Sequence, residues 1–152
     1  MITFYIPNTY WIEKDHAKEY VTGKLGGQPP NFMPFWSLSQ TYPEQRLALA
    51  ELALEVHFRG GDVVIVDTAE EYILRLFRRI REQYDDKAYP NEPKDYPYDK
   101  PFTHKDMKVI ILTRESLDAP IQEHELEVQP EGDFNSNNLL DGIFHWRGDE
   151  LF

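Results

Sequence analysis

Continuous apolar runs and helical spacings alternate along the chain, and they predict its main elements. Residues 63–66 are Val-Val-Ile-Val, and residues 108–113 are Lys-Val-Ile-Ile-Leu-Thr. Runs of β-branched residues without polar alternation are typical of parallel strands covered on both faces. Residues 2–6, Ile-Thr-Phe-Tyr-Ile, predict another strand. Residues 121–128 alternate between apolar and polar, so they predict a strand with one face in water.

A long helix is predicted over residues 42–59. Thr41 and Glu44 have the spacing of a capping box, and Pro43 costs little in a first turn, where N–H groups have no partner within the helix. The glycine pair at residues 60–61 then favours a left-handed ending. Apolar residues at helical spacing predict a stripe that faces the core, formed by Ala48, Leu49, Leu52, Ala53 and Val56.

A second helix is predicted directly after the strand at residues 63–66. Its apolar face consists of Ile73, Leu76, Phe77 and Ile80, at spacings of three and four residues. Two glutamates open this helix and four arginines lie toward its end, which complements the helix dipole at both termini. A shorter helix is predicted over residues 13–20, before Gly23.

Together these elements predict a single α/β domain over residues 1–152, with a small, partly parallel sheet flanked by helices. Residues 22–40 mix Gly and Pro with large apolar side chains, and we expect an ordered loop pinned by Phe32, Phe35 and Trp36. Residues 84–106 carry several Pro and Tyr without an apolar period, which predicts a long excursion.

Composition excludes several classes of protein. The formal net charge of -11 would repel a phosphate backbone, so binding of free nucleic acid is disfavoured. The chain has no cysteine, and its five histidines lack the spacing of a metal site, so no metal or other cofactor is expected. Its start does not resemble a signal peptide, and no apolar run reaches the roughly 18 residues that span a bilayer. We therefore expect a cytoplasmic protein without membrane contact.

The junction between the strand at residues 63–66 and the helix that follows it is the first candidate site. Asp67 and Thr68 follow the strand, and the carboxyl end of a parallel strand is where open α/β sheets bind ligands. The simpler interpretation is that Thr68 caps the helix.

The arginines of the following helix are the second candidate. Arg75, Arg78 and Arg79 offer a contact for an anion or an acidic partner. The simpler interpretation is a solvated helix face, on which a Glu71–Arg75 pair and the helix dipole account for the charges.

Residues 42–80 and the end of the chain resemble the C-terminal part of ABC-type AAA ATPases related to OLD and SMC-like proteins, of the DUF3696 variety. The resemblance rests on Pro43, a near match at Gln45, the segment LALAELALE, the segment VVIVDTAEEYILRLFRRI, and the closing EGDF and LLDGIFHWRGDELF. In that family a Glu-Thr-His-Ser-Glu switch follows the strand. Asp67 and Thr68 fall on its Glu-Thr, Ala69 on its histidine and Glu70 on its serine.

The nucleotide-binding parts of that family are missing from this sequence. No segment has the P-loop form G-x-x-x-x-G-K-S/T, and no strand ends in the paired acids of a Walker B motif. Phosphoryl transfer depends on a backbone cradle, a lysine and metal-binding carboxylates. ATP hydrolysis by this chain alone is therefore not expected, and residues 67–70 are interpreted as a relic of the switch with no catalytic residue.

The resemblance therefore implies a non-catalytic module that binds a protein partner or itself, in a family often encoded near bacterial defence genes. An alternative is a subunit of a split ATPase that a separate P-loop protein completes. A third hypothesis is a metal-dependent hydrolase whose carboxylates come from residues 121–128 and from Glu131, Asp133, Asp141, Asp149 and Glu150, although no motif fixes their geometry.

Overall fold

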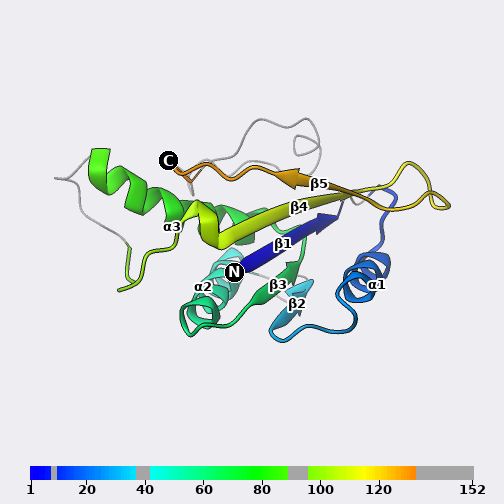
Figure 1. Ribbon diagram of the computed structural model, residues 1–152, viewed down its shortest axis with the longest axis horizontal. Helices are drawn as coiled ribbons and strands as arrows, with labels where there is room; N and C mark the ends of the chain where they lie inside the picture. The colour runs from blue at the N-terminus through cyan, green and yellow to red at the C-terminus, as the bar shows by residue number, and fades with distance from the viewer. Residues whose placement is uncertain (8–9, 37–41, 89–95, 133–152) are drawn as a thin grey trace.

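The computed structural model describes residues 1–7, 10–36, 42–88 and 96–132, and it shows an α/β domain built on one five-stranded sheet (Figure 1). Along the chain the elements are β1 (Ile2–Pro7), α1 (Lys14–Lys24), β2 (Phe32–Pro34), α2 (Pro43–Phe58), β3 (Val63–Val66), α3 (Glu70–Ala88), a 3-10 turn (His104–Asp106), β4 (Met107–Thr113) and β5 (Gln122–Leu126). The predicted class, a small and mostly parallel sheet flanked by helices, is confirmed.

The strand order is β2-β3-β1-β4-β5, so β1 lies in the centre. It pairs in parallel with β3 on one side and with β4 on the other, and Phe4 lies opposite both Ile65 and Val109. β2 pairs in parallel with β3, and only β5 runs antiparallel to its neighbour. The strands predicted at residues 2–6, 63–66 and 108–113 are therefore the three at the middle of the sheet.

Helices cover both faces of the sheet. α2 and α3 pack on one face, where Leu54 and Phe77 join a large apolar core with Phe4. α1 packs on the other face, where Ala17 and Val21 join a smaller core. Among the described residues, no helix is both long enough and apolar enough to cross a bilayer.

The predicted apolar face of α2 is wrong in part. Ala50, Ala53 and Leu54 are fully buried, whereas Leu52 is 39% exposed and Ala48 is also exposed. The segment LALAELALE places Leu and Ala around the whole helix, so spacing alone does not identify the buried side.

The start of α2 also differs from the predicted capping box. The helix begins at Pro43, so its third residue is Gln45, whose side-chain Oε1 accepts from the Tyr42 backbone N at 3.4 Å. Glu44 was expected in that role. Thr41, the expected cap, lies outside the described residues.

Two corrections concern residues 22–40, which were predicted as a loop. α1 continues past residue 20 to Lys24, and residues 32–34 form the edge strand β2, in which Met33 is buried. Phe32 and Phe35 pack against the core on the α1 side as expected. Trp36 is instead 39% exposed.

Residues 84–106 are more regular than the predicted excursion. α3 extends to Ala88, and a 3-10 turn at His104–Asp106 leads directly into β4. Residues 96–102, here called the tyrosine segment, end in the fully buried Phe102. Residues 89–95 and the chain end from 133, including the acids at 133, 141, 149 and 150, lie outside the described residues.

The wet face predicted for residues 121–128 is confirmed. In β5 Glu123 and Glu125 are exposed on one face, and Leu126 on the other face is buried in the core that α2 and α3 share. Within the turn that follows, the Gly132 N donates to the Gln129 O at 3.0 Å.

At Gly132 the backbone of this turn lies close against the backbone of α3. The φ of Gly132 is +74°, and a Cβ placed there would lie 2.4 Å from the Phe77 backbone O and 2.5 Å from the Arg81 backbone N. We therefore predict that Gly132→Ala lowers the free energy of unfolding by about 2–4 kcal/mol, measured by urea denaturation.

The matched control is Gly23→Ala in the last turn of α1, where a Cβ meets nothing within 4 Å. There the substitution is expected to leave stability unchanged or to raise it by up to about 1 kcal/mol, because alanine favours a helix. Equal effects of the two substitutions would contradict the close approach.

Candidate functional site

The parallel pairing brings the ends of four strands to one edge of the sheet. Their last residues are Pro7, Pro34, Val66 and Thr113, and we call this the carboxyl edge. The arrowheads of β1, β2 and β3 all point to the same side in Figure 1. The chains that leave β1 and β3 turn to opposite faces, since α1 and α3 pack on opposite faces. Such a switch point is the usual ligand position in open α/β sheets.

Asp67 lies at this switch point, as predicted, and it is fully buried. Its backbone N donates to the Tyr5 O at 3.1 Å, which continues the pairing of β3 with β1. Its side-chain Oδ1 accepts from the backbone N of Thr68 at 2.7 Å and from that of Ala69 at 3.0 Å. The side chain that bonds the amides of the junction is thus Asp67, where the sequence pointed to Thr68.

Carboxylates also open α3. Glu70 and Glu71 are the first two residues of the helix, and the Glu71 carboxylate lies 3.3 Å from the Arg46 guanidinium of α2. Negative charge is favourable at the positive end of a helix dipole. It would also repel a phosphate group placed at this junction.

Tyr72 closes the junction from the side of the core. It is fully buried, its hydroxyl donates to the Met33 Sδ at 3.0 Å, and its ring meets Phe4 edge to face. Burial, and to a smaller extent the charge of Asp67, raises the pKa of Tyr72. The hydroxyl therefore stays protonated at neutral pH and supplies no general base.

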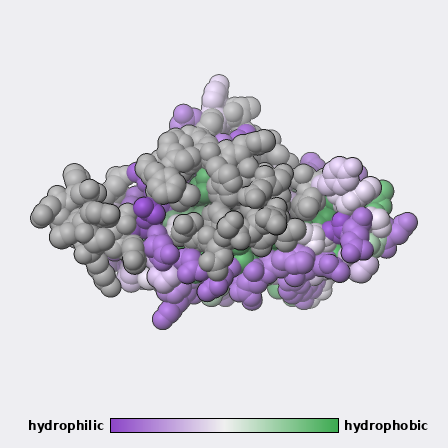
Figure 2. Space-filling model, turned by 90° about the horizontal axis from the view of Figure 1, so that it is seen from above, coloured by the Kyte–Doolittle hydropathy of each residue, from purple (hydrophilic) through white to green (hydrophobic). Residues whose placement is uncertain are grey.

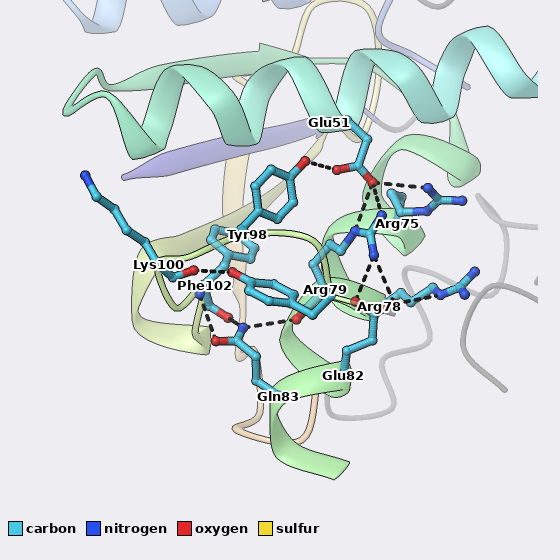
Figure 3. A network of polar contacts seen from close by, with 10 residues as sticks. Glu51, Arg75, Arg78, Arg79, Glu82, Gln83, Tyr98, Lys100 and Phe102 are labelled. Carbon is cyan, nitrogen blue, oxygen red and sulfur yellow. Dashed lines mark hydrogen bonds and ion pairs between the residues drawn. The ribbon is translucent and has the colours of Figure 1, made fainter. Parts of the chain in front are cut away.

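The predicted arginine cluster lies further along α3 and faces α2 (Figure 3). One carboxylate on α2, Glu51, accepts from Arg79 at 2.7 Å and from Arg75 at 3.1 Å. On the other side, Glu82 pairs with Arg79 at 2.9 Å and with Arg78 at 3.2 Å. Each of the three arginines therefore has a carboxylate partner within the chain.

The tyrosine segment completes this network. The Tyr98 hydroxyl donates to Glu51, and the Tyr98 ring lies 5.9 Å from the Arg79 guanidinium. The Gln83 side chain donates to the Phe102 O and accepts from the Phe102 N at 3.1 Å. The network thus joins α2, α3 and the tyrosine segment.

The electrostatics of the network fix its protonation. Burial alone would raise the pKa of Glu51, but the hydrogen bonds from Tyr98 and Arg79 and the charge of Arg79 outweigh burial and hold this pKa below its usual range. Burial and the hydrogen bond to Glu51 raise the pKa of Tyr98. At neutral pH Glu51 is thus charged and Tyr98 neutral.

The two candidate sites do not meet. Glu70 and Arg79 are nine residues apart on one helix, which is about 14 Å along its axis. Within residues 1–7, 10–36, 42–88 and 96–132, no three acidic or histidine side chains are grouped so that they could hold a metal ion. The third hypothesis, a metal-dependent hydrolase, therefore finds no site in the described part of the chain.

No protein-family model, characterised protein or solved structure matches this chain significantly. The resemblance to ATPases therefore stays a prediction from the sequence motifs.

The role of Asp67 is testable by substitution. We predict that Asp67→Ala lowers the free energy of unfolding by about 2 kcal/mol, because two backbone amides lose their acceptor in a buried place. Asp67→Asn keeps an acceptor oxygen and should cost less. Thr68→Ala is the matched control, with an effect within about 0.5 kcal/mol in urea denaturation. A larger loss for Thr68→Ala than for Asp67→Ala would contradict the assignment.

Glu51 gives a second stability test with a defined pH dependence. We predict that Glu51→Gln lowers the free energy of unfolding by about 2–3 kcal/mol at pH 7, since Arg79 loses a charged partner. In the folded chain the pKa of Glu51 lies below its ordinary value of 4.5. Its contribution is therefore present above pH 4.5 and disappears as the pH falls through the lower, folded value.

The difference between the original chain and Glu51→Gln should shrink below pH 4.5, measured by denaturation at a series of pH values. Glu55→Gln, an exposed glutamate one turn further along α2, is the control and should change little. A difference independent of pH would contradict the ion-pair assignment.

Proposed function

We propose that this chain is a non-catalytic protein-interaction module on an ATPase-like α/β scaffold. The observation that carries the proposal is the chemistry of the carboxyl edge. At the place where an open α/β sheet binds its ligand, Asp67 is buried and uses its carboxylate to bond the next two backbone amides. These amides already donate to Asp67, so they cannot donate to a phosphate group in the way that free amides at a helix start do.

Charge at the junction supports the same conclusion. Phosphoryl transfer is catalysed by donors and cations that neutralise the transferred group. The junction instead presents the carboxylates of Glu70 and Glu71. A split ATPase, completed by a separate P-loop protein, would have to place a triphosphate next to these carboxylates, which favours the non-catalytic proposal.

The arginine cluster does not supply the missing positive charge. The side chain of Arg79 is 9% exposed and is held between Glu51 and Glu82. Arg75 also pairs with Glu51, and Arg78 also pairs with Glu82. An anion would have to displace these carboxylates, so we assign the cluster to holding α2 and α3 together.

The proposal predicts that the chain does not bind nucleotide. Isothermal titration with ATP and Mg²⁺ up to about millimolar concentration should give no saturable heat, because the junction offers carboxylates in place of cations. A P-loop ATPase domain titrated under the same conditions provides the positive control. Saturable binding in the micromolar range that requires Mg²⁺ would contradict the proposal.

A further inference from the structure

Four exposed aromatic residues lie in the segments next to the carboxyl edge. Tyr10 is 79% exposed, Tyr42 63%, Trp36 39% and Trp11 37%. The rings of Tyr10 and Trp11 contact each other edge to face with centroids 4.8 Å apart. Monomeric proteins rarely leave such large side chains grouped in water, and groups of them mark interaction sites. These four residues are called the aromatic edge.

The topology explains why they lie on the same side of the molecule. Tyr10 and Trp11 follow the end of β1, and Trp36 follows the end of β2, which runs parallel to β3 and β1. Tyr42 precedes the first turn of α2, which the Arg46–Glu71 pair holds beside the first turn of α3. Of the other large exposed apolar residues, Leu25 lies at the end of α1 and Leu52 in the middle of α2. Leu117 lies in the turn after β4, next to the carboxyl edge.

The surface around the aromatic edge is acidic. The acidic residues in the segments next to it, at the first turns of the helices and in the turn after β4, are Glu13, Asp15, Glu44, Glu70, Glu71, Glu115 and Asp118. The basic residues there are Lys14, Arg46 and Arg114. Arg46 and Glu71 pair with each other, so neither adds to the net charge of this surface, and Arg114 donates to the Ala119 O at 2.6 Å. Figure 2 shows hydrophilic atoms along much of the visible rim and paler and green atoms at its right-hand end, where Figure 1 places α1 and the β4–β5 turn.

We infer that the carboxyl edge is a docking surface for a segment of a partner protein that carries arginine or lysine side chains beside apolar ones. Tyr and Trp are the residues that most often dominate the binding energy of protein interfaces. Their ring faces also attract cations, and the surrounding carboxylates provide ion-pair partners and speed the encounter. This inference rests on the proposed function and specifies the surface and the partner class.

Charge separates this partner from the alternatives. A second copy docking through the same edge would bring Glu13, Glu44 and their neighbours against identical carboxylates. Nucleic acid and nucleotides carry phosphates and meet the same repulsion. A basic segment is the partner for which both the aromatic rings and the carboxylates of the edge are favourable.

The test uses the full chain and three fluorescently labelled peptides of equal length. They share the same leucine and glycine positions and differ only in carrying arginine, glutamine or glutamate at the remaining positions. Binding is measured by fluorescence anisotropy. We expect the arginine peptide to bind at least about tenfold more tightly than the glutamine peptide, with no binding of the glutamate peptide.

Variants distinguish the aromatic edge from the general negative field of the protein. The double variant Tyr10→Ala with Trp36→Ala keeps the charge of the protein. It should weaken binding of the arginine peptide at least about fivefold. The control double variant, Leu25→Ala with Leu52→Ala, also removes exposed apolar residues. Its affinity for the arginine peptide should stay within about twofold of that of the original chain. The double variant Glu13→Gln with Glu44→Gln removes two carboxylates next to the edge and should weaken binding of the arginine peptide about threefold. Its control, Glu19→Gln with Glu55→Gln, removes two carboxylates elsewhere and should leave this binding unchanged. Circular dichroism confirms the fold of each variant.

Equal binding of the arginine and glutamine peptides would overturn the inference. Equal losses in the edge variants and in their controls would also overturn it, because binding would then follow the net charge alone. If light scattering shows that the chain self-associates and that Tyr10→Ala with Trp36→Ala abolishes this association, the edge binds a second copy and the basic partner is wrong. Saturable, Mg²⁺-dependent binding of ATP to the chain in the absence of any peptide would contradict the proposed function itself, whatever the peptides do, which separates the two failures.

Discussion

The parallel pairing of β1 with β3 and β4 is the constraint on which the rest of this structure depends. It places Phe4 between Ile65 and Val109 in the centre of the core and sends the chain to both faces of the sheet. It also brings the ends of the strands, and the segments that follow them, to the carboxyl edge. The candidate site, the acids around it and the exposed aromatic residues are together because of this pairing.

The Glu51–Arg79 network has a different role, which is to fix how α2, α3 and the tyrosine segment pack. Arg79 is buried and touches carboxylates from both sides. Buried ion pairs contribute little net stability compared with apolar side chains of similar size, but losing one partner is costly. The arginines that looked like a binding site in the sequence are therefore part of the helix packing, and the surface that we propose for a partner lies elsewhere.

The sequence predicted most of the fold because local signals agreed with the tertiary structure at β1, β3, α3 and β4. It predicted the bounds of α2 but not its buried face, because Leu and Ala residues surround the helix. It missed β2, whose three residues are too short to form a pattern. The junction was located correctly at Asp67, but its bonds to the backbone depend on burial. Glu51, Tyr98 and Gln83 were missed because their partners are 19 to 47 residues away in the chain.

Hydrogen exchange at the Thr68 and Ala69 amides tests the central claim most directly, because both donate to the buried Asp67 carboxylate. Exchange of each amide is followed by NMR in the chain alone and with millimolar ATP and Mg²⁺. We expect slow exchange in the chain alone and no change with nucleotide, since these donors are already occupied. Fast exchange that slows when ATP and Mg²⁺ are added would show that the amides form a nucleotide site.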